Sequence, residues 1–239
     1  MRPETSLVVA LDGPASSGKS SVGAAAAARL GYRFCDTGLL YRAVTWLALR
    51  RGVSEAETAR LEALVAEVEL IPDPAGRLAH VSVDGEDVTR VVHGPEVDAA
   101  VSAISRVPEL RARLLERQRQ IAADGRIIMA GRDIGTVVLP RADLKLFLDA
   151  SIEERARRRI DERGTDPEGS EAGEIRAQLR RRDEMDATRA AAPLRVAPDA
   201  IVIKTDGNAF ATTVELVVAA ITERAAGLGA PTSRTASAT

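Results

Sequence analysis

Cysteine is nearly absent from this chain: Cys35 is the only one among 239 residues. A single thiol cannot form an internal disulfide, which excludes the disulfide-stabilised scaffolds of small secreted proteins. No apolar run reaches the length needed to cross a bilayer, and no hydrophobic signal segment follows Met1 to Glu4. We therefore expect a soluble, cytoplasmic protein in which Cys35 is a buried structural thiol.

Net charge and aromatic side chains are also scarce. The formal net charge is -2, and aromatic residues make up 3% of the chain. Such a chain has neither the positive field nor the stacking surface of a nucleic-acid-binding protein, so we expect no nucleic-acid partner and no membrane partner. We also expect a monomer. Around His80 and His93 there is no pattern of cysteines or carboxylates typical of a metal site.

The clearest positive signal is a glycine-rich segment near the N-terminus. Residues 13–20 read GPASSGKS and fit the phosphate-binding pattern G-x-x-x-x-G-K-S, between an apolar strand pattern at 7–11 and an alanine-rich helical pattern at 21–30. The backbone N–H groups of such a loop surround a polyphosphate, and its lysine and serine contact the outer phosphates and Mg²⁺. We predict a nucleoside triphosphate site formed by Gly13, Pro14, Ala15, Ser16, Ser17, Gly18, Lys19, Ser20 and Ser21, with Ser20 as the metal ligand.

Alternating strand and helix patterns extend along most of the remaining sequence. They predict an α/β fold with three layers, in which helices cover both faces of a central parallel sheet. The Asp84-Gly85 pair between two alternating runs predicts a hairpin, so we expect a small β insertion at 69–92. A loop followed by a charged helical stretch predicts a mobile lid at 161–193, and the composition of 226–239 predicts a disordered tail.

Arginines at predicted strand ends and in the predicted lid indicate a second phosphate site. Arginine forks match phosphate oxygens, and two bound phosphates facing each other suit direct phosphoryl transfer without a separate general base. The candidates are Arg42, Arg132, Arg182 and Arg189. No guanine-reading Asn/Thr-Lys-x-Asp motif occurs, which disfavours a switch GTPase. From the pattern alone, Arg182 fits a solvated helix face equally well, and Asp133 also fits a loop cap.

Four separated motifs, at 13–20, 36–42, 131–138 and 182–189, resemble those of bacterial cytidylate kinases. The resemblance extends from residue 7 to residue 225 and implies the P-loop nucleoside monophosphate (NMP) kinase fold. It implies phosphorylation of CMP or dCMP to CDP or dCDP, with ATP as the phosphoryl donor and Mg²⁺ as cofactor. It also divides a single domain at 5–225 into a core (5–36, 107–160 and 194–225), an NMP-binding part (37–106) and a lid (161–193).

The same resemblance implies roles for individual residues. The cytosine base would lie against Ser102, Arg111 and Asp133, which offer a carboxylate to its amine and donors to its acceptors. The other expected acceptor-site residues are Arg42 and Arg132 at the CMP phosphate, Asp36, Thr37 and Tyr41 around it, and Arg182 with Asp186 at the ribose. Arg189 would approach the transferring phosphate, so the expected catalytic residues are Lys19, Arg132, Arg182 and Arg189.

One position departs from this family pattern. The family commonly has an acidic residue immediately before Gly-Arg-Asp, where this chain has Ala130. In related kinases that carboxylate helps organise the waters of Mg²⁺, so either Asp36 or Asp12 would have to compensate. Two other functions remain open: a P-loop kinase acting on UMP, another nucleoside monophosphate or shikimate, and a regulatory ATPase stimulated by a partner.

Overall fold

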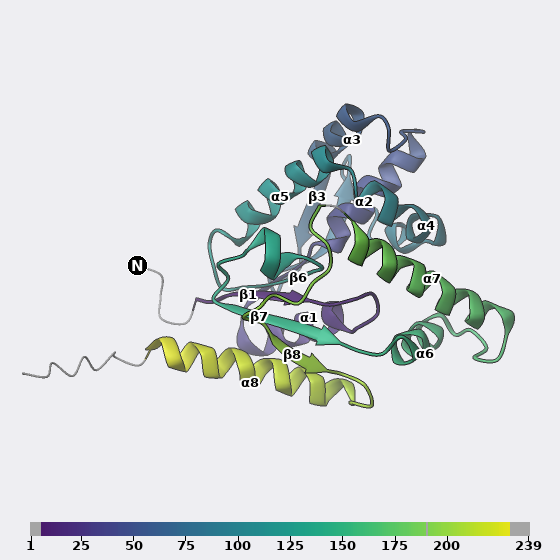
Figure 1. The fold of residues 1–239 in the computed structure, drawn as a ribbon. Coiled ribbons are helices and arrows are strands. Elements are labelled where there is room, and N and C mark those ends of the chain that lie inside the picture. The colour runs from purple at the N-terminus through teal and green to yellow at the C-terminus, as the bar shows by residue number, and fades with distance from the viewer. Residues whose placement is uncertain (1–5, 190, 230–239) are drawn as a thin grey trace, which may run out of the picture.

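The computed structural model describes residues 6–189 and 191–229 (Figure 1). Within these residues, eight strands form one sheet in the order β3-β4-β2-β6-β1-β7-β8, with β5 paired to β4. The strands are β1 (Val8–Asp12), β2 (Arg33–Asp36), β3 (Val68–Pro72), β4 (Arg77–Val83), β5 (Glu86–Asp87), β6 (Ile127–Gly131), β7 (Leu144–Asp149) and β8 (Ile201–Lys204).

Helices surround this sheet. They are α1 (Lys19–Leu30), α2 (Gly38–Arg50), α3 (Thr58–Leu64), α4 (Pro95–Ile104), α5 (Pro108–Ala122), α6 (Ile152–Arg163), α7 (Ser170–Thr188) and α8 (Phe210–Gly229), with the short turns η1 (Val65–Glu67), η2 (Val91–His93) and η3 (Ile134–Val138). The helices α4 and α5 begin at prolines, whose missing N–H would have no partner in the first turn of a helix. None of the described helices is long and apolar enough to cross a membrane.

The layers follow from the alternation of side chains along the central strands. In β1, Val9 and Leu11 pack toward α1 and α8, whereas Val8 and Ala10 pack toward α5 and η3. The strands β2, β6, β1, β7 and β8 are all parallel, so their carboxyl ends share one edge of the sheet. The predicted α/β fold, a mostly parallel sheet between two helical layers, is confirmed (Figure 1).

The predicted β insertion is part of this same sheet. The strands β3, β4 and β5 form antiparallel pairs, and Asp84 and Gly85 turn the chain with φ angles of 52° and 79°. Beyond the hairpin, β4 pairs in parallel with β2 through Phe34 and Cys35. Burying the edge of β2 in this way satisfies backbone groups that would otherwise need water.

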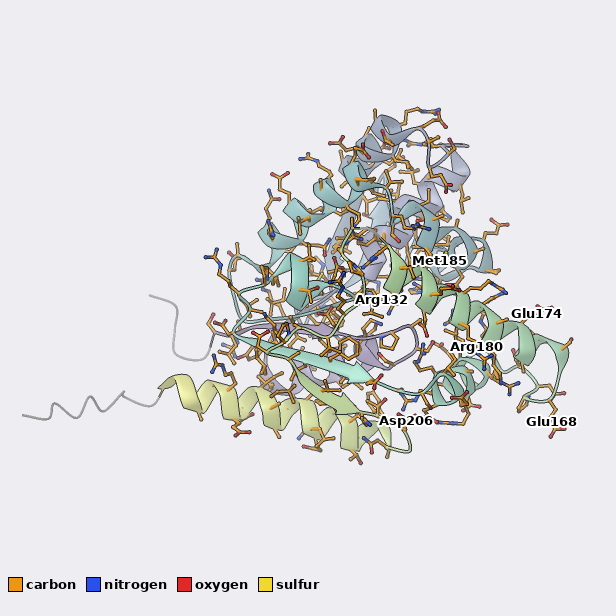
Figure 2. All side chains as sticks on the ribbon, in the orientation of Figure 1. Arg132, Glu168, Glu174, Arg180, Met185 and Asp206 are labelled. Carbon is orange, nitrogen blue, oxygen red and sulfur yellow. The ribbon has the colours of Figure 1, made fainter. Side chains whose placement is uncertain are left out.

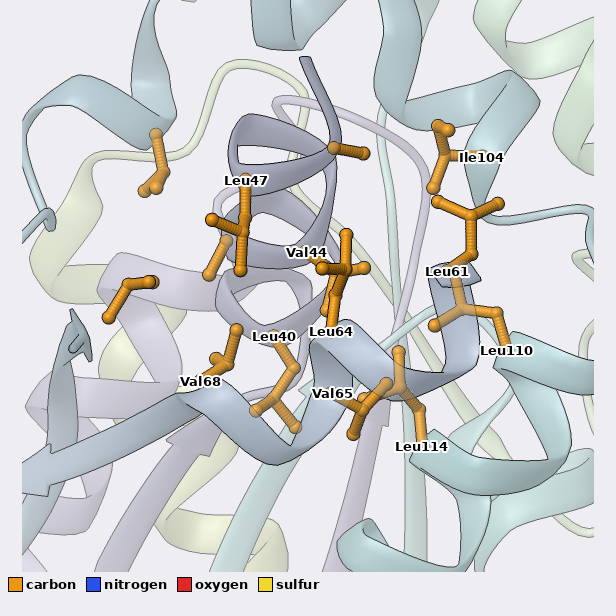
Figure 3. Close-up of a cluster of buried hydrophobic side chains, with 14 of the residues drawn as sticks. Leu40, Val44, Leu47, Leu61, Leu64, Val65, Val68, Ile104, Leu110 and Leu114 are labelled. Atoms are coloured by element: carbon orange, nitrogen blue, oxygen red, sulfur yellow. The ribbon is translucent and has the colours of Figure 1, made fainter. Parts of the chain in front are cut away.

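A second apolar core lies beside the insertion, where α2 packs between α3, α4, α5 and the hairpin (Figure 3). Its largest fully buried side chains are Leu40, Leu61, Leu110 and Leu114. This core fixes α2 and α4 as one unit, and both helices carry predicted acceptor-site residues.

The predicted lid, 161–193, contains the end of α6 and all of α7, and these two helices pack through Ile160, Ile175 and Leu179. At the C-terminus the expected tail begins too early, because α8 continues to Gly229. Ala225 and Ala226 favour helix over coil, and the helix continues through Gly227 to Gly229. The remainder of the expected tail, 230–239, lies outside the described residues.

Candidate active site

The glycine-rich loop lies between the buried strand β1 and the first turn of α1. A Cβ atom at Gly13 would collide with the carbonyl oxygen of Leu148, so the close approach of the loop to β7 requires glycine there. Lys19 donates a hydrogen bond of 3.0 Å from Nζ to the carbonyl oxygen of Pro14. Burial, with repulsion from Arg132, holds the pKa of Lys19 well below its usual value. A bound anion beside Lys19 would relieve both effects.

A cavity of about 890 Å³ extends from this loop across the carboxyl ends of β1, β2 and β6. This is the edge at which open α/β sheets bind ligands. The predicted residues that line it are Ala15, Ser16, Gly18, Lys19, Ser20, Ser21, Asp36, Thr37, Tyr41, Arg42, Ser102, Arg111, Arg132, Asp133, Arg182, Asp186 and Arg189. The other three residues of the predicted set, Gly13, Pro14 and Ser17, are buried within the loop and do not line the cavity.

Arginines from α2, from the loop after β6 and from α7 line this cavity together, and Arg132 and Arg42 lie near enough to Arg182 to repel it. Arg132 donates from Nε to Asp186 of α7 at 2.8 Å and from Nη1 to the carbonyl oxygen of Gly13 at 2.7 Å. It therefore joins α7 to the glycine-rich loop, and Figure 2 shows it between the sheet and α7.

Arg182 is the least satisfied of these cations. Its Nε atom is buried and has no hydrogen-bond partner among the described residues. Burial, followed by repulsion from Arg132 and Arg42, lowers its pKa to about 10. A buried donor without an acceptor costs free energy, so this arrangement favours an anionic ligand.

A buried ion pair also lines the cavity: Arg111 donates to the carboxylate of Asp133 at 2.5 Å. The guanidinium of Arg111 also lies 5.6 Å from the centre of the Tyr41 ring. Burial raises the pKa of Asp133, although Arg111 and Arg189 oppose this shift. Nη2 of Arg189 lies 3.5 Å from Asp133 and has no hydrogen-bond partner among the residues described. Ser102, a buried residue of α4, lines the same cavity.

The two carboxylates that were candidates to compensate for Ala130 have different surroundings. Asp36 faces the loop: Oδ2 accepts from the Ser20 hydroxyl at 2.5 Å and Oδ1 from the Gly38 N–H at 2.9 Å. Its register partner in β6 is Ala130, which is fully buried. The hydroxyl of Thr37 donates to the carbonyl oxygen of Ala130 at 2.9 Å, which ties the end of β2 to β6.

Asp12 forms hydrogen bonds with the protein backbone. Its two carboxylate oxygens accept from the N–H groups of Ile134 and Gly135 at 2.8 and 2.7 Å, at the start of η3. Burial raises its pKa to about 6, although these two hydrogen bonds favour the charged form. Because both oxygens are engaged away from the cavity, Asp36 is the carboxylate that remains available there.

Several charged cavity residues were not predicted from the sequence. Among them are Asp98 on α4 and Arg158, Arg159, Glu162 and Arg163 on α6. In the sequence, the α6 residues are part of a run of alternating charges at helical spacing, which is typical of a solvent-exposed face. Only the fold shows that this part of α6 borders the cavity, where Arg158 and Arg159 are partly buried whereas Arg157 of the same helix is exposed.

Comparison with known proteins gives consistent results. Residues 9–223 match the protein family described as cytidylate kinase. A cytidylate kinase of Nocardia farcinica is 47% identical over 208 residues, covering 86% of this chain and 89% of the relative. One of Solibacter usitatus is 42% identical over 222 residues, covering 91% and 93%. Among solved structures, an uncharacterized protein from Eubacterium ventriosum, 10% identical, has a TM-score of 0.52 over 91% of this chain and 99% of that chain, which supports the fold alone.

Proposed function

The chain belongs to the cytidylate kinase family, and we propose that it transfers the γ-phosphoryl group of ATP to CMP or dCMP, producing CDP or dCDP and ADP. The observation that carries this proposal is the single cavity that connects the phosphate loop to the Arg111–Asp133 pair. A hydrolase needs one nucleotide site and a water, whereas this cavity is lined by the glycine-rich loop, by several arginines and by the Arg111–Asp133 pair, which suits two nucleotides.

The chemistry proposed for this cavity is in-line transfer between two bound phosphates. Lys19 would hold the outer phosphates of ATP, and Arg42 would hold the acceptor phosphate. Arg132 and Arg182, in the middle of the cavity, would neutralise the charge that develops on the transferring group, and Arg189 would approach it from the lid side. No protein nucleophile is required, because a phosphate oxygen of CMP attacks the γ-phosphorus and ADP leaves.

The oxygen donors beside the loop fit Mg²⁺. The hydroxyl of Ser20 and the carboxylate of Asp36 already contact each other, and hard oxygen donors of this kind suit Mg²⁺. The described residues contain no cluster of three or more His, Cys, Asp or Glu side chains that could hold a metal by itself, so phosphates and water would complete the set. When bound, Mg²⁺ would neutralise phosphate charge, with Ser20 and Asp36 holding it to the protein.

The pocket around Arg111 and Asp133 supports recognition of cytosine. A cytosine ring offers an amine donor beside two acceptors, so it would meet the Asp133 carboxylate on one side and Arg111 and Ser102 on the other. Uracil reverses the pattern at two of these positions and would leave buried groups facing like partners. Asp186, held by Arg132, and Arg182 would lie near the ribose.

Steady-state turnover with ATP and each of CMP, dCMP, UMP and AMP tests the proposal. We expect CMP and dCMP to be among the best acceptors, with ADP and the pyrimidine diphosphate formed in equal amounts. A strong preference for UMP or AMP would indicate a different nucleoside monophosphate kinase. ATP hydrolysis without any diphosphate formed from CMP would indicate a regulatory ATPase.

Location and assembly remain part of the proposal. The buried thiol of Cys35 and the absence of a membrane-spanning helix among the described residues support a cytoplasmic enzyme. We further propose that it acts as a monomer, because one chain supplies every group that the reaction requires. Sedimentation of the active enzyme tests this assembly state directly.

A further inference from the structure

One carboxylate outside the predicted site holds three arginines. Asp98, on α4, accepts hydrogen bonds from Arg42 at 2.6 Å, from Arg159 at 2.8 Å and from Arg163 at 2.9 Å. The Asp98 side chain is 13% exposed, and all four residues line the cavity. These are charge-assisted hydrogen bonds in a mostly desolvated place, which makes them stronger than surface ion pairs.

The three arginines belong to different parts of the fold. Arg42 lies on α2, in the part that would hold the acceptor, whereas Arg159 and Arg163 lie at the end of α6, where the lid begins. Asp98 lies on α4, which packs against α2 and contributes Ile104 to the apolar core of Figure 3. A single side chain on a rigid helix therefore connects the acceptor side of the cavity to the base of the lid.

This arrangement also fixes the direction of Arg42 before any ligand binds. Its Nη2 donates to Asp98 and its Nη1 to the carbonyl oxygen of Val92 at 2.9 Å. Burial opposes ionisation of Asp98, but the attraction of Arg42 and Arg159 outweighs it, and the pKa of Asp98 stays below its usual value. The carboxylate thus remains charged throughout the neutral range.

We infer that Asp98 is a positioning residue, which orients Arg42 for the acceptor phosphate and, through Arg159 and Arg163, couples acceptor binding to the lid. The inference rests on the proposed function, since it assigns Arg42 to the phosphate of CMP. It predicts that removing the carboxylate weakens acceptor binding, although the change makes the cavity more positive. If Asp98 only screened the arginines, its removal would strengthen binding of the anionic acceptor.

The test compares Asp98→Asn with Glu96→Gln, which removes a charge of the same sign from an exposed position in the first turn of the same helix. The dissociation constant of CMP is measured by calorimetry, with and without a non-hydrolysable ATP analogue. Loss of charge-assisted hydrogen bonds to Arg42 predicts a roughly tenfold to hundredfold weaker affinity for CMP in Asp98→Asn. The affinity for the ATP analogue alone should change less than about threefold, and Asp98→Glu should recover part of the CMP affinity.

A second variant, Arg163→Gln, removes one of the two α6 contacts of Asp98, leaves the Arg159 contact in place and changes a partly exposed side chain. It should leave the affinity for CMP alone within about twofold of wild type and reduce the gain in CMP affinity that the ATP analogue provides. The inference is overturned if Asp98→Asn binds CMP as Glu96→Gln does, or more tightly, or if Arg163→Gln retains the full gain. The wild type separates the two claims: absence of CMP turnover there refutes the proposed function, whereas normal turnover with unaffected variants refutes only the role of Asp98.

Discussion

Replacing Asp133 by asparagine tests whether this side chain reads the base. The carboxylate pairs with Arg111 at 2.5 Å and lies 3.5 Å from Arg189, with side-chain exposures of 8%, 10% and 5% for the three residues. Truncation to alanine would leave two buried guanidinium groups without their carboxylate and cost about 3–5 kcal/mol of unfolding free energy. Asparagine keeps one oxygen for Arg111, so its cost should be closer to about 1–3 kcal/mol and the protein should fold.

The effect on recognition has a defined direction. A carboxylate accepts only, which suits the amine of cytosine, whereas an amide both donates and accepts, which suits uracil. In Asp133→Asn, kcat/KM for CMP should fall about tenfold to hundredfold, since a mispaired hydrogen-bond partner costs roughly 1–3 kcal/mol. The value for UMP should fall much less or rise, so the ratio of the two constants is the decisive quantity.

The assay needs three measurements on wild type and on the asparagine and alanine variants: kcat/KM with CMP and with UMP, the dissociation constant of an ATP analogue, and denaturant unfolding. The unfolding curves separate loss of structure from loss of recognition. An unchanged ratio of CMP to UMP constants would refute the assignment of Asp133 to the base. An equal loss of affinity for the ATP analogue would instead assign Asp133 to the metal or to the fold.

Three further substitutions probe the loop and its supports. Asp36→Asn should weaken binding of ADP with Mg²⁺ about tenfold and leave metal-free ADP unaffected; calorimetry that finds both unchanged would remove Asp36 from the metal site. Because burial raises the pKa of Asp12 to about 6, the folded state holds this proton more tightly than the unfolded chain does, so the contribution of Asp12 to the unfolding free energy falls as pH rises from about 4 through 6. Asp12→Asn lacks this titration. Its unfolding free energy relative to that of wild type should therefore rise by about 2–3 kcal/mol between pH 4 and pH 7, and a difference that does not change with pH would contradict the raised pKa. Gly13→Ala should lower the unfolding free energy by about 1–3 kcal/mol and raise KM for ATP, because its new methyl group meets the Leu148 carbonyl; wild-type values for both would show that the loop can move aside.

The local patterns of the sequence were sufficient to predict the glycine-rich loop and the fold class. A strand followed by a glycine-rich turn and a helix is determined by short-range preferences, and the loop at 13–20 lies where these preferences place it. Local preferences also mark the starts of α4 and α5, at Pro95 and Pro108. At the start of α6, the side chain of Ser151 accepts a hydrogen bond from the N–H of Glu154. The helix α8 continues four residues past the expected boundary at 225, through Gly227, because a glycine near the end of a helix weakens it without fixing where it ends.

The roles of the charged side chains were decided only by the tertiary structure. Asp12 and Asp36 each end a strand of the sheet, and no pattern in the sequence favours one of them. In the folded protein Asp12 is used by the backbone of η3, whereas Asp36 faces Ser20. From the sequence, Asp98 cannot be distinguished from the other charged residues of α4. In the folded protein, α6 places two arginines in contact with it. Sequence determines which groups exist and which local structure holds them, but the direction and the partners of a charged side chain depend on packing between segments far apart in the chain.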